Sequence, residues 1–403
     1  MVKIAVLGHG VVGSGVMQVM MQNKESIARR AGDEISVKYI LDLREFDGLP
    51  YSDLFVKDYN IILNDPEVKI VVEVLGGLHP AYDFSKAALL HGKSVVTSNK
   101  EVVAEKGGEL LNLARKNNLN YLFEASVGGG IPIIRPISQC LAANEIYQIS
   151  GILNGTTNYI LTRMFKNGVP FNDALYEAQK LGYAERNPSA DVDGIDTCRK
   201  ICILASLAFG RHIYPETVYT QGISSITADD VALAEKTGSV IKLLGVAKKL
   251  KNGKISIMTA PFVVKNTSPL SNVDDVFNGI VVSGNATGDV MFYGRGAGKM
   301  PTASACVADI IDEVKHLNAR KYLCWAETDT REMNTIIEDI NEQGFSYMLR
   351  FEDQNVKAEC FNEIKGLESV AENGAITPFV KESEMKALLE KFKNRVACYR
   401  ISE

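Results

Sequence analysis

Two groups of residues in this sequence have types and spacings that suit chemistry. The first fits the pattern G-x-G-x-x-G and consists of Gly8, His9, Gly10, Val11, Val12 and Gly13. In this pattern the first glycine allows a tight turn, the second lets a pyrophosphate approach the backbone, and the third lets helix and strand pack closely. The N-terminus of the following helix favours an anion. The pattern predicts dinucleotide binding; the alternative is a glycine turn with a structural role alone.

The second group lies near the middle of the chain. Asp196 and Lys200 are four residues apart on an expected helix and therefore share one face. On an exposed face they would form an ion pair worth a few tenths of a kcal/mol. On a buried face, which the apolar neighbours favour, the lysine beside a carboxylate can act as a proton donor. The acids Glu185 and Asp191 would then suit an ammonium-bearing substrate, and both interpretations stay open.

Polar residues also stand at the C-terminal ends of two expected strands, where parallel sheets bind ligands. Ser98 and Lys100 can hydrogen-bond a nicotinamide or a substrate, although a lone lysine is often solvent-exposed. Asp42 can accept from the ribose 2′-hydroxyl of NAD, whereas Arg44 can pair with the 2′-phosphate of NADP. A solvated turn is equally compatible with this charge pair, so the choice between NAD and NADP stays open.

The elements that must position these residues change character along the chain. Up to residue 125, strands alternate with helices, which predicts an α/β fold with a doubly wound parallel (Rossmann-type) sheet. After Ser126, two amphipathic or apolar helices precede strands typical of an antiparallel sheet. We expect a dinucleotide-binding domain over 1–130, completed by a returning helix at 301–319 that starts at Pro301. A second α+β domain is expected over 131–300, and a small α+β C-terminal domain over 321–403.

Composition limits the class of protein. With 403 residues, 46% hydrophobic and 23% charged, the chain is expected to form a globular protein of more than one domain. The net charge of −5 argues against nucleic acid as a partner. Seven cysteines in a long chain, no secretory pattern and no run long enough for a membrane span predict a cytoplasmic protein away from membranes. The histidines lack metal-ligand spacing, and the sequence has no Walker A pattern, nucleophile elbow or Cys–His signature. An enzyme here would therefore use hydride transfer with lysine acid–base chemistry.

Taken together, the motifs resemble the homoserine dehydrogenase family. The matching segments keep the family's order: GHGVVGSG (8–15), EVLGG (73–77), TSNK (97–100), EASVGGGIP (124–132), GILNGTTNYIL (151–161), LGYAE (181–185), DVDGIDTCRK (191–200) and GRGAGKMPTASACVADI (294–310). The resemblance implies NAD(P)-dependent interconversion of L-aspartate 4-semialdehyde and L-homoserine, a step toward threonine and methionine. The alternatives are a nucleotide-binding sensor without catalytic activity and a dehydrogenase of another amino-acid semialdehyde.

The resemblance also implies roles for single residues. Lys200 matches the family's proton donor, and Lys100 matches a lysine near cofactor and substrate. The acids that would bind homoserine are Glu185, Asp191 and Asp196, with Asn154 and Tyr183 as supporting contacts. Positions near the cofactor are Gly76, Ser98, Gly182 and Gly298. The loop residues matching a structural sodium site, formed mostly by carbonyl oxygens, are Glu124, Val127, Gly129 and Ile131.

Two features depart from the family's pattern. His9 stands where the family often has a smaller residue in the glycine motif. The tail from Lys321 resembles an ACT domain, the module through which threonine inhibits many relatives. Its segment TDTREMN, however, lacks the proline-glycine turn usual after the first strand, which favours a degenerate module over a threonine effector site.

The resemblance also implies a homodimer or larger assembly built on the second domain's sheet.

Overall fold

The structure is a computed structural model that describes residues 1–392 and 395–402. It divides into two compact units. Unit 1 comprises Met1–Asn144, Cys202–Pro215 and Gly294–Asp329, and unit 2 comprises Glu145–Ile201, Glu216–Tyr293 and Thr330–Glu403. No helix in the part of the chain that the structure describes is long and apolar enough to cross a membrane.

Unit 1 is built on a parallel sheet of six strands in the order β3-β2-β1-β4-β5-β6. The strands are β1 (Val2–Leu7), β2 (Ile35–Leu41), β3 (Phe55–Val56), β4 (Val68–Glu73), β5 (Ser94–Thr97) and β6 (Tyr121–Leu122). This order reverses direction at β1 and β4, as in doubly wound dinucleotide-binding sheets, and it confirms the predicted fold class. The sixth strand is shorter than the segment 120–125 expected from the sequence, because the chain turns at Glu124–Ser126.

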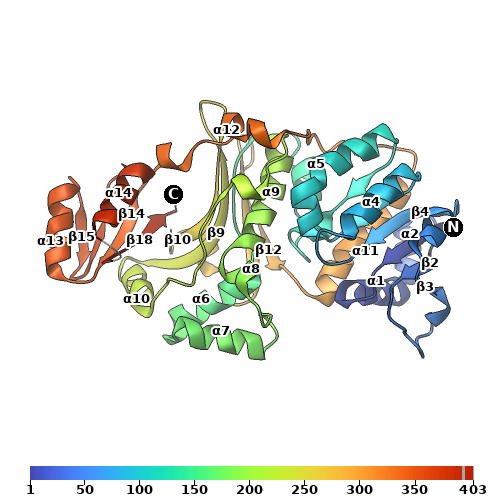
Figure 1. The fold of residues 1–403 in the computed structure, drawn as a ribbon, viewed down its shortest axis with the longest axis horizontal. Coiled ribbons are helices and arrows are strands. Elements are labelled where there is room, and N and C mark those ends of the chain that lie inside the picture. The colour runs from blue at the N-terminus through green and yellow to red at the C-terminus, as the bar shows by residue number, and fades with distance from the viewer. Residues whose placement is uncertain (393–394, 403) are drawn as a thin grey trace. The chain divides into compact units, whose positions relative to one another are not determined.

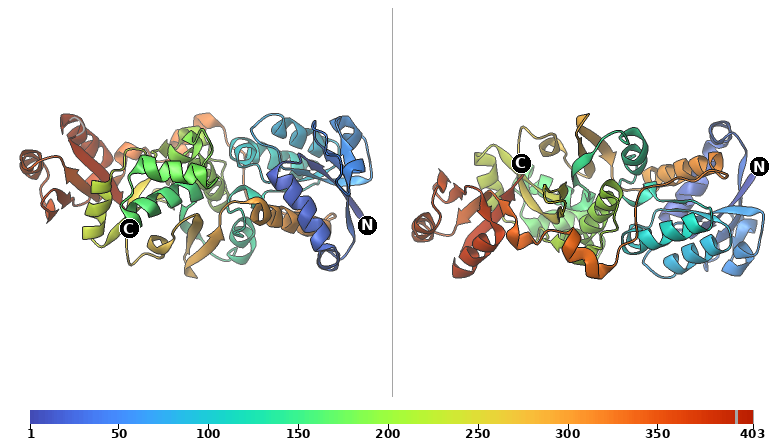
Figure 2. Two further views of the ribbon diagram at one scale, coloured as in Figure 1. Left: turned by 90° about the horizontal axis from the view of Figure 1, so that it is seen from below. Right: turned by 90° about the horizontal axis from the view of Figure 1, so that it is seen from above.

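Helices cover both faces of this sheet. They are α1 (Val11–Gln22), α2 (Lys24–Ala31), α3 (Tyr59–Leu63), α4 (Ala81–Leu90), α5 (Lys100–Lys116) and α11 (Lys299–Lys315). Figure 1 and Figure 2 show α4 and α5 on one face and α1, α2 and α11 on the other. Because both faces are covered, most strand residues are apolar, and Ile4, Val6, Ile70 and Val72 are fully buried.

The late helix α11 belongs to unit 1 although it follows the second group of strands in sequence. Its residues Cys306 and Ile310 share one core with Val16 of α1. The helices approach so closely that a Cβ on Gly15 would lie 2.9 Å from the Ala303 Cβ. The helix begins at Lys299 rather than at Pro301, which lies in the first turn, where a backbone N–H has no helical partner.

Unit 2 contains a mixed sheet of ten strands in the order β12-β11-β7-β9-β10-β18-β14-β16-β15, with β8 also paired to β10. The strands are β7 (Ile146–Ile152), β8 (Tyr219–Thr220), β9 (Ser239–Lys249), β10 (Ile255–Lys265), β11 (Phe277–Gly284), β12 (Gly288–Arg295), β14 (Tyr347–Phe351), β15 (Glu368–Ala371), β16 (Gly374–Ile376) and β18 (Val396–Ile401). The antiparallel sheet expected from the sequence is thus only part of it, because β8 and β18 run parallel to β10.

Several helices pack on this sheet. The helices of unit 2 are α6 (Gly155–Asn167), α7 (Phe171–Lys180), α8 (Ser189–Val192), α10 (Ala228–Lys236), α12 (Met333–Ile336), α13 (Gln354–Glu363), α14 (Glu382–Phe392) and the first half of α9 (Ile195–Phe209). Residues of α6, α7 and α10 form one core with β9 and β10 (Figure 1). A short ladder of β13 (Gly344–Phe345) and β17 (Val380–Lys381) completes the described elements.

From Tyr347 on, and apart from the short strand β17 between β16 and α14, the tail has the order β14–α13–β15–β16–α14–β18. This is the β-α-β-β-α-β order of ferredoxin-like folds. Its strands do not form a separate sheet, because β18 pairs with β10 and extends the sheet of unit 2. The division of the chain into domains at 130, 300 and 321 stays a prediction.

Candidate active site

The glycine turn between β1 and α1 has the geometry that its sequence predicts. Gly8 has a positive φ of 96°, and a Cβ on Gly13 would lie 2.0 Å from the Gly8 oxygen. A Cβ on Gly10, by contrast, would meet no atom within 4 Å. The first turn of α1 contains no acidic residue and its N-cap Gly10 supplies no side-chain cap, so no side chain of this turn neutralises the positive end of the helix dipole. The turn therefore fits a pyrophosphate.

His9 is buried beside this turn, in contact with aromatic rings. Its ring lies 4.7 Å from that of Phe46 and 5.1 Å from that of Phe55, both edge-on. Burial lowers its pKa. The backbone N–H of His9 donates to the Asp42 carboxylate at 2.8 Å. The larger residue at this position is thus accommodated by a pocket of its own, and it links the glycine turn to the end of β2.

Two loops at the same edge of the sheet carry further predicted residues. Gly76 is exposed after β4, and Ser98 is half-buried after β5. Asn99 caps α5, because its Oδ1 accepts from the N–H groups of Glu101 and Val102, both at 3.1 Å. Lys100 is the first residue of that helix. The cap fixes the backbone that carries Lys100 at the ligand-binding edge.

Sequence reasoning missed Glu73 at this edge. It is the last residue of β4 and is fully buried, with its carboxylate bound to Leu75 and Thr97. The segment EVLGG drew attention to Gly76, whereas an acid at the end of an apolar strand is normally taken as solvent-exposed. The signal available was its place within the run VKIVVEVLGG, where both sheet faces are expected to be covered.

In unit 2, four predicted residues form one hydrogen-bonded network. Asn154 Nδ2 donates to Asp191 Oδ1 at 2.7 Å and to Asp196 Oδ2 at 2.8 Å. Lys200 Nζ donates to the same Asp196 Oδ2 at 2.8 Å and to the Leu153 carbonyl oxygen at 2.8 Å. The side chains of Lys200 and Asp196 are only 8% and 3% exposed, which excludes the exposed ion pair. The network places the buried Lys200 amino group next to Asp196 and links it through Asn154 to Asp191.

The ends of two helices hold this network. Asn154 is the N-cap of α6, since its Oδ1 accepts from the Thr157 N–H at 2.8 Å. The cap and the two carboxylate contacts use the opposite ends of one amide, which fixes its orientation. Asp196 and Lys200 lie one turn apart in α9, so the helix sets their spacing.

Gly182, Tyr183 and Glu185 follow the end of α7. Gly182 has a positive φ of 74° after the last helical turn, as expected for a helix-terminating glycine. The Tyr183 ring contacts that of Tyr159 at 5.1 Å, and its carbonyl oxygen accepts from the Thr156 hydroxyl at 2.6 Å. The side chains of Tyr183 and Glu185 are exposed. These residues lie on the surface of unit 2, whereas the Asn154–Lys200 network is largely buried.

The loop with the predicted cation ligands is closed by a buried acid. Both carboxylate oxygens of Glu124 accept hydrogen bonds, from the N–H groups of Ile133, Ile134 and Arg135 at 2.6–2.9 Å. Gly129 has a φ of 55°, and a Cβ on it would lie 2.4 Å from the Gly296 oxygen. Val127 and Ile131 are buried. The Glu124 side chain therefore shapes the loop, and a cation would have to be held by carbonyl oxygens.

Gly298 lies in unit 1 as the N-cap of α11, with a φ of 125°. The residues matched to the cofactor thus fall mainly in unit 1, and those matched to the substrate fall in unit 2 together with Gly182. Among the described residues, no cluster of three or more His, Cys, Asp or Glu side chains could hold a metal ion.

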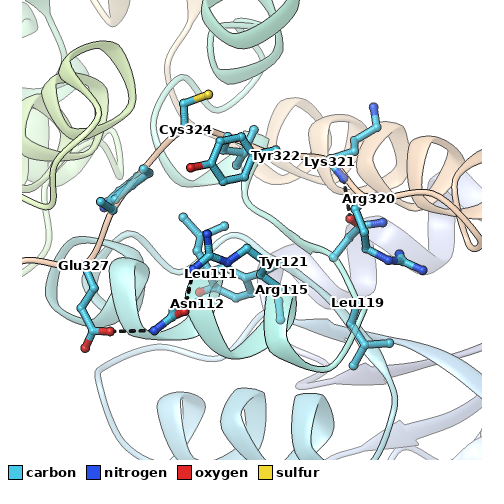
Figure 3. A pocket seen from close by; sticks show the side chains of 15 residues that line it. Leu111, Asn112, Arg115, Leu119, Tyr121, Arg320, Lys321, Tyr322, Cys324 and Glu327 are labelled. Atoms are coloured by element: carbon cyan, nitrogen blue, oxygen red, sulfur yellow. Dashed lines mark hydrogen bonds between the residues drawn. The ribbon is translucent and has the colours of Figure 1, made fainter.

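A cavity of about 390 Å³ in unit 1 contains none of the predicted site residues. It lies between α5, β6 and the segment 320–327, and Figure 3 shows the Asn112 side chain bound to Glu327 at its border. Two of its cationic groups already have partners, since Lys321 pairs with Asp312 at 2.6 Å and Arg320 donates to Asn118. The cavity is therefore separate from the glycine turn and the loops that follow β4 and β5.

Comparison with known proteins gives a consistent family. A family model described as homoserine dehydrogenase matches residues 132–311, and one described as homoserine dehydrogenase, NAD binding domain, matches residues 8–124. A homoserine dehydrogenase of Synechocystis sp. is 45% identical over 322 residues, covering 78% of this chain and 73% of the relative. One of Bacillus subtilis is 40% identical over 321 residues, with the same two coverages.

Solved structures agree. A homoserine dehydrogenase from Thiobacillus denitrificans has a TM-score of 0.91 at 35% identity and covers 100% of this chain and 98% of its own. One from S. aureus has a TM-score of 0.79 at 31% identity, with the same two coverages. A hyperthermophilic archaeal homoserine dehydrogenase mutant in complex with NADPH has a TM-score of 0.65 at 30% identity, covering 77% of this chain and 97% of its own. These findings do not favour the two alternatives, a nucleotide-binding sensor without catalytic activity and a dehydrogenase of another amino-acid semialdehyde.

Proposed function

The chain belongs to the homoserine dehydrogenase family, and from this membership we propose how its residues divide the work. The family's activity is that of an oxidoreductase that interconverts L-homoserine and L-aspartate 4-semialdehyde with NAD(P). The observation that carries the assignment of roles is the buried Asn154–Asp191–Asp196–Lys200 network. The test is an assay of homoserine oxidation with NAD and with NADP, and failure with both would contradict it.

Unit 1 binds the dinucleotide in this proposal. The N–H groups at the start of α1 bind the pyrophosphate, and Gly10 leaves room for it. Gly76, Ser98, Lys100 and Gly298 are the further cofactor contacts proposed in unit 1, and Gly182 is the one that the family resemblance implies in unit 2. When bound, NAD(P) accepts a hydride from homoserine or supplies one to the aldehyde. An archaeal relative solved with NADPH supports the use of a nicotinamide dinucleotide.

Lys200 moves the proton. In the reducing direction its ammonium protonates the aldehyde oxygen, and in the oxidising direction its amine takes the proton of the homoserine hydroxyl. The Asp196 carboxylate, whose Oδ2 lies 2.8 Å from Nζ, orients this amino group. Lys100 assists near the cofactor and substrate.

The acids bind the substrate. Glu185 and Asp191 would bind the ammonium group of homoserine, and Asp196 its hydroxyl end together with Lys200. Asn154 holds two of these carboxylates in place through its amide donors. Tyr183 flanks the segment that carries Glu185. With carboxylates around its cationic amino group, an amino-acid semialdehyde should bind more tightly than a plain aldehyde.

A structural sodium ion is proposed at the carbonyl oxygens of Glu124, Val127, Gly129 and Ile131. Oxygen ligands suit such a hard cation. The tight closure of this loop by the Glu124 carboxylate supports carbonyl ligation, because the side chain is already used by backbone N–H groups.

Assembly and regulation are proposed from the family. The chain acts as a cytoplasmic homodimer or larger assembly, with no nucleic-acid or membrane partner. The tail is an ACT-like module, which the order of its strands and helices supports. Adding threonine to the homoserine oxidation assay tests whether threonine is the effector of this tail. If the rate of oxidation is the same with and without threonine, the tail has a structural role.

A further inference from the structure

Glu73 is an acid at the end of an otherwise apolar run of β4. It follows Ile70, Val71 and Val72 in β4 and is 0% exposed. Desolvation on burial raises the pKa of its carboxyl to about 7. Burying an ionisable group is costly unless hydrogen bonds compensate it. The groups that compensate this carboxyl therefore indicate its role.

The carboxyl joins the two loops that end β4 and β5. Its Oε1 accepts from the Leu75 N–H at 2.7 Å, within the loop that leads to Gly76. Its Oε2 accepts from the Thr97 hydroxyl at 2.5 Å, across the paired ends of the two strands. One side chain thereby fixes both loops at the ligand-binding edge of the sheet.

Thr97 connects Glu73 to Asn99, the residue that caps the helix carrying Lys100. Its hydroxyl oxygen accepts from the Asn99 N–H at 2.9 Å. The Asn99 side chain donates back to the Gly77 carbonyl oxygen at 2.8 Å while its oxygen caps α5. Glu73, Thr97 and Asn99 therefore form a closed set of hydrogen bonds between the loops.

We propose that Glu73 is a positioning residue for the nicotinamide dinucleotide, which it serves by holding the Leu75–Gly77 loop at a fixed distance from the start of α5. It acts through the backbone of these loops and touches neither substrate nor cofactor. The inference rests on the proposed function of unit 1 as the cofactor-binding part. It assigns a role to Glu73 within the segment EVLGG, in which the resemblance implies only Gly76 as a cofactor position.

The test measures the dissociation constants of NADPH and NADH by titration without homoserine, using the full chain. Glu73→Leu keeps the volume but removes both acceptors, and we expect it to weaken binding about tenfold or more. Glu73→Gln can still accept from Leu75 and donate to the Thr97 oxygen, so binding should stay within about threefold of wild type. The Michaelis constant for homoserine should change less than the dissociation constant of the cofactor.

Glu313 supplies the matched control. It is a second fully buried acid of unit 1, on α11, and it accepts from the Asn120 side chain at 2.7 Å rather than from the two loops. Glu313→Leu should lower the midpoint of thermal unfolding and leave the affinity for NADPH unchanged. Equal losses of affinity in the Glu73 and Glu313 variants would overturn the proposal, as would wild-type affinity in Glu73→Leu.

Thr97 provides a second route should Glu73→Leu fail to fold. Thr97→Val removes the hydroxyl alone and should weaken NADPH binding, whereas Thr97→Ser should restore it. Wild-type affinity in Thr97→Val would overturn the proposal. Because binding is measured without homoserine, failure of the wild-type protein to oxidise homoserine would contradict the proposed function separately.

Discussion

Arg44 donates two hydrogen bonds to the carboxylate of Asp42, from Nε to Oδ1 at 3.0 Å and from Nη2 to Oδ2 at 2.8 Å. The backbone N–H groups of His9 and Arg44 donate to the same carboxylate at 2.8 and 3.1 Å. Hydrogen bonds from Arg44 hold the pKa of Asp42 well below its usual range. The acid that would bind a ribose 2′-hydroxyl is therefore already engaged, while the Arg44 side chain is 62% exposed.

The Asp42–Arg44 pair predicts how a substitution of Arg44 changes the choice between NADP and NAD. Arg44→Ala should raise the Michaelis constant for NADP about tenfold relative to that for NAD, because a 2′-phosphate loses its cation. The measurement is homoserine oxidation at varied concentrations of each cofactor. An Arg29→Ala variant, altered on α2, should leave the ratio unchanged, and an equal effect of Arg44→Ala on both cofactors would contradict the prediction.

The role proposed for Lys200 predicts that its replacement lowers turnover without weakening cofactor binding. Lys200→Met should lower kcat for homoserine oxidation by about 10²–10⁴, the range typical of general acid–base catalysis, while NADPH still binds. The matched control is Lys242, a second buried lysine of unit 2 that donates to the Val273 carbonyl oxygen at 2.6 Å. Lys242→Met should reduce stability but keep turnover per folded molecule. Retained turnover in Lys200→Met would remove its assigned role.

The first unit was largely predictable because its signals are local. Most of its strands are short apolar runs that end at a glycine or a polar residue. Gly8 has the positive φ, and Gly13 the close approach to the turn, that their motif requires. The end of β6 was not predictable in the same way. Its limit is set by Glu124, whose N–H donates to the Asp309 side chain at 2.8 Å instead of continuing the strand. That partner is 185 residues away.

In the candidate site, too, features set by local sequence were predictable and contacts between distant segments were not. Asp196 and Lys200 were recognisable because helix periodicity alone places them on one face. Their connection to Asn154 depends on the cap of α6, a helix that the sequence interpretation did not assign. Glu73 was missed because its burial depends on Thr97 and on helices packed over both faces of the sheet. Contacts between distant segments leave little trace in local sequence.

The raised pKa of Glu73 predicts how stability changes with pH. The native carboxyl titrates at about 7 and the unfolded one near 4.5, so the native state binds the proton more tightly. The contribution to stability is complete below the unfolded pKa and is lost as pH rises through about 7. We expect this group to lower the free energy of unfolding by about 1–3 kcal/mol between about pH 5 and pH 8.

The measurement is urea unfolding of wild type and Glu73→Gln over that range of pH. Gln cannot titrate, so the difference in unfolding free energy between the two proteins should shift in favour of the variant as pH rises. Curves that stay parallel for the two proteins would show that Glu73 does not titrate there.

The glycine turn gives a pair of substitutions with opposite expected effects on folding. Gly10→Ala should fold normally, because its Cβ enters open space, but it should weaken NADPH and NADH binding about tenfold or more by occupying the approach of the pyrophosphate. Gly13→Ala should instead destabilise unit 1, since its Cβ would lie 2.0 Å from the Gly8 oxygen and the close packing of α1 on the turn would be lost. Thermal unfolding and cofactor titration of both variants separate the two effects. If the Gly10→Ala protein binds NADPH as tightly as wild type, the pyrophosphate does not bind at this turn, because the added methyl group would occupy the space that the pyrophosphate needs.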